Sequence, residues 1–339
     1  MNRAKGLISL ATRSSTQRRS VSAPVNADKP TKWKEDIAAS VDFYNVWFMK
    51  FAPRVYRETR VTATKQVEDA FSWTTNLTGL TPSALKIHPE IIGRLRMATA
   101  PPIARDRLIG LAGVSSNLVR AMELDGTLPR NMPDSLLSEE LVKICKLILA
   151  MADKDILTWL DSGQVPTKDE VHRASTIIAD RLCGAQSDPI VRNAQETRQL
   201  ESIGNWLKDR GYAHRKGPKF DQMQTNTYAF RVNVPVKLPK TGKQVNIPAD
   251  VAVMRRNAKA GEIPLLIEAK SAGDYTNPNK RRKEEATKIT QLKETHGASI
   301  QYVLFLCGYF DSGYLGYEAA EGIDWVWEHR IDDLRHFGL

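Results

Sequence analysis

Four strand-like runs between residues 228 and 307, with a highly charged helical segment before the last of them, constrain the fold most. The first three runs alternate or are rich in β-branched residues, at 228–238, 244–254 and 263–270, and the fourth, 300–307, is apolar throughout. The segment 277–296 predicts a helix that stops at Gly297. Short connections make the first three runs an antiparallel meander, whereas the helical crossover joins the fourth to the same sheet. The pattern predicts a mixed sheet flanked by helices.

Helical patterning dominates the remainder of the chain. Residues 34–51 form an amphipathic pattern that Pro53 is expected to end. Asp188-Pro189 is expected to open a helix that runs to about residue 210, and a last helix is expected over 324–337. Helices followed by a sheet with helical crossovers predict a fold of the α+β or α/β class.

Charge and composition indicate a polyanionic partner and divide the chain. The 339 residues carry a formal net charge of +10. The stretch before Asn26 is basic, rich in Ser and Thr and free of acids, which predicts a disordered arm, with an organellar transit peptide as the alternative. No apolar run reaches the length of a membrane span, and the three cysteines have neither zinc-site nor disulfide spacing, so a reducing cytoplasm fits. The expected divisions are a basic arm at 1–30, a helical region at 31–185 and a sheet-containing core at 186–339.

Two acids and a lysine fall on neighbouring strands of the expected sheet. Asp250 follows Pro248-Ala249 in the second run, and Glu268-Ala269-Lys270 ends the third. Because strand side chains alternate between faces, Glu268 and Lys270 project from one side, and a hairpin can bring Asp250 beside them. No other acid-any-lysine triplet occurs in the chain. Two carboxylates and an ammonium suit a divalent cation and an attacking water, the chemistry of phosphodiester hydrolysis.

A salt bridge from Lys270 to Asp250 or to Glu268 is the alternative interpretation of these residues. Glu268 ends a buried run, where an unpaired carboxylate is costly, so a metal or a cationic partner is expected in either case. Short motifs of this kind arise often by chance, so the assignment depends also on the residues that surround them.

Glu196 is a candidate for a third acid at the same place. It shares a helical stripe with Leu200, Ile203 and Leu207, on the side expected to face the sheet. We expect it to support a metal ion, with an ion pair to a neighbouring arginine as the alternative.

Two further segments are candidate DNA contacts. The cations Lys280, Arg281, Arg282 and Lys283 begin the helix that follows the Glu-Ala-Lys strand, and they suit phosphate contacts, with a solvated helix face as the alternative. Residues 105–123 read as helix, glycine-containing turn and helix, the pattern of a helix-turn-helix, which also occurs without DNA. Ser115 would be the N-cap of its second helix, and the residues expected to face outward are Ser116, Asn117 and Arg120.

The chain resembles the XamI-type type II restriction endonucleases, within the wider PD-(D/E)xK nuclease superfamily. The resemblance covers most of the chain from about residue 28 onward. It rests on the runs Pro101-Pro102-Ile103-Ala104-Arg105-Asp106-Arg107-Leu108, Arg192-Asn193-Ala194-Gln195-Glu196, Pro248-Ala249-Asp250 with Glu268-Ala269-Lys270, and Gly308-Tyr309-Phe310-Asp311-Ser312-Gly313-Tyr314. The proline that usually stands directly before the aspartate is displaced by one position, which removes no ligand.

The resemblance implies Mg²⁺-dependent cleavage of double-stranded DNA at a short palindrome by a cytoplasmic bacterial homodimer. A cognate DNA methyltransferase would protect the host, and the recognition site implied is GTCGAC. By position, Asp250 and Glu268 would bind the metal, and Lys270 would orient or deprotonate the attacking water.

Two rival functions follow from the same residues. A structure-specific repair or recombination nuclease of the same fold would cut only at branches, ends or flaps. A helix-turn-helix DNA-binding protein with an inactive nuclease domain would bind without cutting, and the intact Asp250, Glu268 and Lys270 argue against it.

Overall fold

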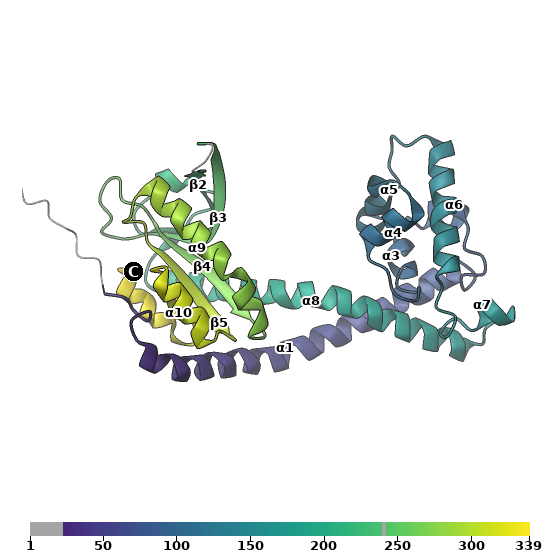
Figure 1. Ribbon diagram of the computed structural model, residues 1–339, viewed down its shortest axis with the longest axis horizontal. Helices are drawn as coiled ribbons and strands as arrows, with labels where there is room; N and C mark the ends of the chain where they lie inside the picture. The colour runs from purple at the N-terminus through teal and green to yellow at the C-terminus, as the bar shows by residue number, and fades with distance from the viewer. Residues whose placement is uncertain (1–22, 239–241) are drawn as a thin grey trace, which may run out of the picture. The chain divides into compact units, whose positions relative to one another are not determined.

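The computed structural model describes residues 23–238 and 242–339, and the side chains of 277–282 are outside that description. The chain forms two compact units. The sheet unit comprises the residues up to Asp42 and Leu200–Leu339, and the helical unit comprises Phe43–Gln199. Two long helices, α1 (Pro30–Trp73) and α8 (Lys168–Asp209), contribute to both units (Figure 1). The helical unit ends at Gln199, within α8, and the division expected at 185/186 with its assigned roles stays a prediction.

A mixed sheet organises the sheet unit. Its six strands within the described residues follow chain order: β1 (Ala213–His214), β2 (Thr227–Lys237), β3 (Gln244–Met254), β4 (Leu265–Ala272), β5 (Tyr302–Gly308) and β6 (Asp324–Trp327). Strands β2, β3 and β4 form an antiparallel meander, and β4, β5 and β6 are parallel. The predicted meander and the helical crossover into β5, through α9 (Thr276–His296), are both confirmed.

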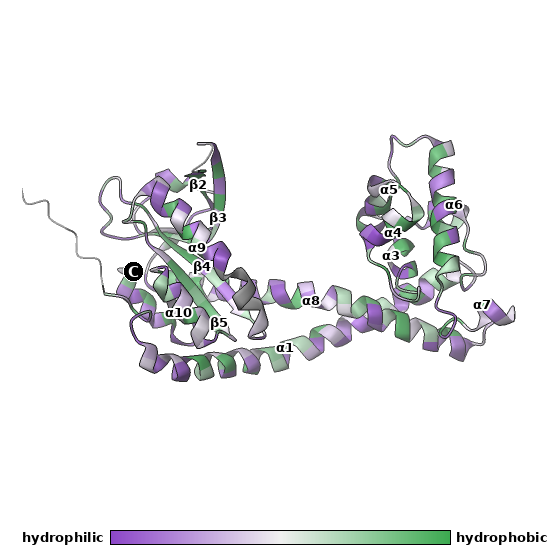
Figure 2. Ribbon diagram, viewed as in Figure 1, coloured by the Kyte–Doolittle hydropathy of each residue, from purple (hydrophilic) through white to green (hydrophobic). Residues whose placement is uncertain are grey.

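Helices cover both faces of the sheet. Ile289 and Leu292 of α9 and Leu315 of α10 (Ser312–Ala320) pack in one core with the side chains of alternate strand positions. Ile203 and Leu207 of α8 pack in a second core on the opposite positions, together with the 3-10 helix η4 (Glu328–Phe337). Because β5 is buried on both faces, it is apolar along its length, whereas β4 is apolar in its first three residues and then carries Glu268 and Lys270 (Figure 2). The fold predicted from the sequence, helices followed by a mixed sheet, is confirmed.

The helical unit has a core of its own. Its elements are α2 (Pro82–Ile87), η1 (Pro89–Ile91), α3 (Ile92–Leu95), α4 (Arg105–Ala112), α5 (Ser116–Arg120), η2 (Ala121–Asp125), α6 (Asp134–Ala150) and α7 (Trp159–Ser162), with the adjoining parts of α1 and α8. Trp159 is fully buried, and its indole N–H donates to the carbonyl of Asn76 at 2.8 Å. None of the helices in residues 23–238 and 242–339 has the length and apolar character needed to cross a membrane.

Both predicted proline boundaries are wrong. Helix α1 continues through Pro53, and α8 begins at Lys168 and continues through Pro189. A proline inside a helix removes one hydrogen bond and costs about 3 kcal/mol. Burial on both sides of each proline outweighs that cost: Tyr44 and Val55 flank the first, and Cys183 and Gln195 flank the second. Helix boundaries inferred from the local sequence include the cost of the proline but not the burial that compensates for it.

The helix expected over 324–337 is also wrong in its first turn. Residues Asp324–Trp327 form β6, and the helical segment begins at Glu328. Trp325 and Trp327 belong to the core under α9 and α10, whereas Val326 belongs to the opposite core. The three apolar residues that follow Asp324 fit a buried strand as well as a helix, so their pattern did not separate the two.

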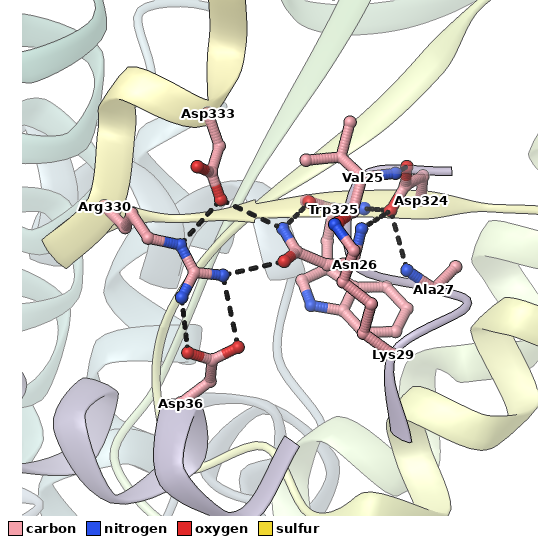
Figure 3. A network of polar contacts seen from close by, with 9 residues as sticks. All are labelled: Val25, Asn26, Ala27, Lys29, Asp36, Asp324, Trp325, Arg330 and Asp333. Carbon is pink, nitrogen blue, oxygen red and sulfur yellow. Dashed lines mark hydrogen bonds and ion pairs between the residues drawn. The ribbon is translucent and has the colours of Figure 1, made fainter. Parts of the chain in front are cut away.

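The predicted disordered arm is only partly within the described chain. Residues 1–22 lie outside it, but 25–30 are bound to the sheet unit, so the prediction is wrong for them. The Asp324 carboxylate accepts hydrogen bonds from the backbone N–H groups of Val25, Asn26 and Ala27 (Figure 3). Arg330 donates to Asn26 at 2.7 Å, to Asp333 at 2.7 Å and to Asp36, and it thereby joins this segment to the first turns of α1.

Candidate active site

The sheet brings Asp250 and Glu268 together. Val251 on β3 pairs with Ile267 on β4, and continuing this antiparallel register places Asp250 opposite Glu268. The Asp250 carboxylate oxygen Oδ2 accepts a hydrogen bond from the backbone N–H of Ala269 at 2.8 Å. The acid on β3 is therefore fixed against the strand that carries the other two residues of the motif.

Glu268 and Lys270 project from one face of β4, as their spacing predicts. The Lys270 ammonium lies 3.3 Å from Glu268 Oε1. The salt bridge and the grouping of two acids with a lysine are thus both present, and neither interpretation excludes the other.

Helix α9 adds two residues that the sequence interpretation missed. Glu285 is buried, and its Oε1 lies 2.7 Å from the Lys270 ammonium. The ammonium of Lys288 lies 2.6 Å from Oε2 of Glu268. The i, i+3 spacing of Glu285 and Lys288 on a helix that follows the motif strand was the available signal, but the charged residues around them concealed it.

Burial and like charge shape the electrostatics of the site. Burial, reinforced by the nearby Glu268 carboxylate, raises the pKa of Asp250 to about 6. Burial alone disfavours the charged form of Lys270, but Glu268 and Glu285 more than compensate and raise the pKa of Lys270 above its usual value. Lys270 is thus held as an ammonium, whereas at Asp250 the nearby lysines do not fully offset the effect of burial and of Glu268 on the pKa.

A buried acid lies behind this group. Glu318 on α10 is fully buried, and burial followed by the proximity of Glu285 raises the pKa of Glu318 to about 8. Tyr314, one turn earlier on α10, has its pKa raised by burial and by Glu318. Acidic side chains therefore outnumber their cationic partners on the interior side of the site, and Glu318 is mostly protonated and neutral at pH 7.

The donor set suits a hard divalent cation. Mg²⁺ binds through one or two carboxylates and completes its shell with water and substrate phosphate. Asp250 and Glu268 supply two facing carboxylates, and burial together with the like charge of Glu268 raises the pKa of Asp250, so a cation between the two acids would be favourable. Among residues 23–238 and 242–339, no three His, Cys, Asp or Glu side chains are grouped closely enough to hold a metal ion. A two-carboxylate site is the arrangement that the residues fit.

Glu196 does not have a defined place in this group. It is half-buried on the part of α8 that belongs to the helical unit, whereas Leu200, Ile203 and Leu207 of the same stripe are buried in the sheet unit. Its role as a further metal ligand stays a prediction.

The candidate DNA contacts are partly visible. Lys283 is exposed on α9, while the side chains of Lys280, Arg281 and Arg282 lie outside the described residues. In the helical unit, α4 and α5 flank a turn at Gly113, which has a positive φ of 61° that favours glycine. Ser116, Asn117 and Arg120 are exposed, as predicted, whereas DNA contact by any of these residues stays a prediction.

The N-terminus of α5 differs from the expected cap. Ser115 occupies the N-cap position, but its side chain makes no capping hydrogen bond. The buried Glu140 of α6 accepts a hydrogen bond from the Ser115 backbone N–H at 3.0 Å instead. A carboxylate there compensates the partial positive charge of the helix end and joins α5 to α6.

Comparisons with known proteins show the family to which the chain belongs. The type II restriction enzyme SalI from Streptomyces albus G is 51% identical over 319 residues, which cover 93% of this chain and 99% of that enzyme. Among solved structures, protein VC1899 from Vibrio cholerae aligns over 75% of this chain and 55% of its own, with 13% identity and a TM-score of 0.27. The model of the XamI restriction endonuclease family matches residues 75–327. That match includes Asp250, Glu268 and Lys270, and the chain belongs to the XamI restriction endonuclease family.

Proposed function

We propose that this type II restriction enzyme hydrolyses phosphodiester bonds of double-stranded DNA at a short palindrome with Mg²⁺ held by Asp250 and Glu268. The observation that carries the proposal is the convergence of Asp250, Glu268 and Lys270 on two paired strands of a chain from a restriction endonuclease family. When bound, Mg²⁺ supplies positive charge to the scissile phosphate and lowers the pKa of a coordinated water.

The chain's own residues divide the remaining work. Asp250 is fixed by the hydrogen bond that it accepts from Ala269, and its other carboxylate oxygen would be available to hold the cation. Lys270 is held as an ammonium beside Glu268, where it can orient the attacking water and stabilise the charge that develops on the phosphate. Helix α9 begins close behind the motif strand, so Lys280, Arg281, Arg282 and Lys283 would contact the DNA backbone.

The helical unit would supply recognition. Exposed Ser116, Asn117 and Arg120 on a helix after a glycine turn suit contacts in a DNA groove. A two-fold homodimer would read two equivalent half-sites, which is why the site is palindromic. We propose GTCGAC as the sequence, a cognate DNA methyltransferase as the functional partner, and the bacterial cytoplasm as the location.

Digestion of a plasmid of known sequence tests the activity. With Mg²⁺ we expect a discrete set of fragments whose mapped ends lie at GTCGAC, and no cleavage with a chelator. Fragments at another palindrome would correct the recognition sequence alone. Cutting confined to branches, ends or flaps would instead assign a repair nuclease.

Substitutions test the site. Asp250→Asn, Glu268→Gln and Lys270→Met are each expected to lower cleavage by about a hundredfold to a thousandfold, in the range of other electrostatic catalytic groups, and to leave DNA binding in a gel-shift assay largely intact. Asp221→Asn, an exposed acid of the same unit, is the control and should cut normally. Wild-type cleavage by Asp250→Asn would overturn the assignment.

A further inference from the structure

We propose that α9 supplies two positioning residues to the active site, Glu285 for Lys270 and Lys288 for Glu268. The inference deepens the proposed function and rests on its assignment of Glu268 to the metal. It assigns roles to a helix whose contribution the motif does not reveal.

The four side chains form an alternating row of charge. Its members, in spatial order, are Lys288, Glu268, Lys270 and Glu285. The strand contributes Glu268 and Lys270 at i, i+2, and the helix contributes Glu285 and Lys288 at i, i+3, so each pair projects from one face of its element. Each strand residue is thereby matched with an opposite charge from the helix.

The burial of the row makes these contacts more than surface ion pairs. The exposed fractions of the side chains are 3% for Glu285, 12% for Glu268, 16% for Lys288 and 22% for Lys270. Charges taken out of water to this degree are tolerated only with a partner at hydrogen-bonding distance, and removing one partner leaves the other uncompensated. The distances of 2.6 and 2.7 Å across the strand–helix contact satisfy that requirement.

Lys288 and a metal ion need the same carboxylate. The ammonium of Lys288 forms an ion pair with Oε2 of Glu268, and the ammonium of Lys270 forms one with Oε1. A divalent cation that binds Glu268 has to share these oxygens with the two ammonium groups or displace one of them, and the two positive charges oppose its binding in either case. Lys288 therefore neutralises Glu268 before the cation arrives and competes with it afterwards.

Glu285 has the opposite effect on the same equilibrium. Its Oε1 gives the Lys270 ammonium a second anionic contact besides Glu268. With Glu285 neutralised, Lys270 would have Glu268 as its remaining anionic contact in the row, and Lys270 would compete more strongly for that carboxylate. Glu285 thus keeps Lys270 in place when Glu268 turns to the cation.

Binding of Mn²⁺ to the full-length protein without DNA tests this arrangement. Lys288→Met is expected to lower the half-saturating Mn²⁺ concentration about tenfold, whereas Glu285→Gln is expected to raise it about tenfold. Lys288→Arg, which keeps the cation, should bind as the wild type does. The controls are Lys259→Met and Glu284→Gln, both exposed, and they should leave Mn²⁺ binding unchanged. Thermal unfolding of each variant without metal checks that it is folded.

The outcomes separate this inference from the proposed function. If Asp250→Asn loses Mn²⁺ binding but Lys288→Met and Glu285→Gln bind as the wild type does, or both bind more weakly, the roles given to α9 are wrong and the metal site stands. If Asp250→Asn binds Mn²⁺ as the wild type does, or neither the wild type nor Lys288→Met binds it, the metal site itself is wrong and this inference falls with it. If Glu285→Gln fails to fold, the direction of the Lys288→Met effect still decides.

Discussion

The carboxylate of Asp250 accepts a hydrogen bond from the backbone N–H of Ala269, which stands between Glu268 and Lys270. One bond of 2.8 Å thus ties the acid of β3 to the centre of the Glu-Ala-Lys triplet of β4. Ala269 is the residue of the triplet whose side chain points to the other face of the strand, toward the core under α8. The backbone of Ala269 therefore positions Asp250, while its side chain packs in the core.

Asp250→Asn should make the metal-free protein more stable at neutral pH while it abolishes cleavage. The pKa of Asp250 is raised from 3.8 to about 6, so the folded state holds its proton more tightly than the unfolded state does. Stability therefore falls as pH rises through this window, and above pH 6 the ionised carboxylate costs at most about 3 kcal/mol. The asparagine can keep the hydrogen bond to Ala269 without that charge. Denaturant unfolding with a chelator at pH 4 and pH 8 measures the difference.

The gain from Asp250→Asn is expected at pH 8 and should disappear near pH 4. Added Mg²⁺ should stabilise the wild type and not the variant, because a ligand that binds only the folded state adds to its stability. Equal stability of the two proteins at pH 8 without metal would show that the buried charge is compensated in some other way.

Glu318→Gln should remove the cost of ionising a second buried acid, and so raise stability over a different pH range. Burial and Glu285 raise the pKa of Glu318 from 4.5 to about 8, so the wild type loses stability relative to the variant as pH rises from about 5 to 8. Above pH 8 the difference should be constant, at most about 5 kcal/mol. Thermal unfolding across pH 5–9 measures it. Glu294→Gln, an exposed acid on α9, should run parallel to the wild type throughout, and a parallel curve for Glu318→Gln would contradict the prediction.

The sheet and the motif could be predicted from the sequence because their signals are local. Strand runs separated by short turns specify the meander, and period 2 places Glu268 and Lys270 on one face. Glu285 and Lys288 were not found, because their importance depends on how α9 packs over β4, a contact between distant segments. The attachment of Asn26 to Arg330 and Trp325 has the same origin: it joins positions about 300 apart in the chain.

The proline errors have a related cause. A proline is a local penalty, and Pro53 and Pro189 are placed in helices whose neighbouring turns are buried by tertiary packing. Helix boundaries inferred from Pro53 and Pro189 failed because the compensating contacts come from elsewhere in the chain. In contrast, the start of α8 is encoded locally: Thr167 accepts from the Glu170 N–H, and Glu170 accepts from the Thr167 N–H.

Arg120→Ala tests whether α5 contacts DNA. If the exposed guanidinium neutralises a phosphate, its loss should weaken DNA binding at all sequences and reduce the slope of log affinity against log salt by about 1. If it reads a base, the loss should be about 1–3 kcal/mol and specific to the cognate site. Fluorescence anisotropy with cognate and scrambled duplexes, in Ca²⁺ in place of Mg²⁺, separates the two. Arg173→Ala, an exposed arginine of α8, is the control, and equal behaviour of both variants would remove α5 from the DNA interface.

Arg330→Met should destabilise the sheet unit through the network of Figure 3. Arg330 bridges Asp36, Asp333 and Asn26, and Asp36 is 6% exposed, so the substitution leaves a buried carboxylate without its cation. Because Arg330 is itself partly exposed, we expect a loss of about 2–3 kcal/mol, somewhat below the range for broken pairs that are fully buried. Arg335→Met is the matched control: its pair with Asp332 is about 60% exposed on both sides and should contribute less than about 1 kcal/mol. Denaturant unfolding of both variants measures the contrast, and equal losses would mean that Arg330 does not hold residues 25–36 to the sheet unit.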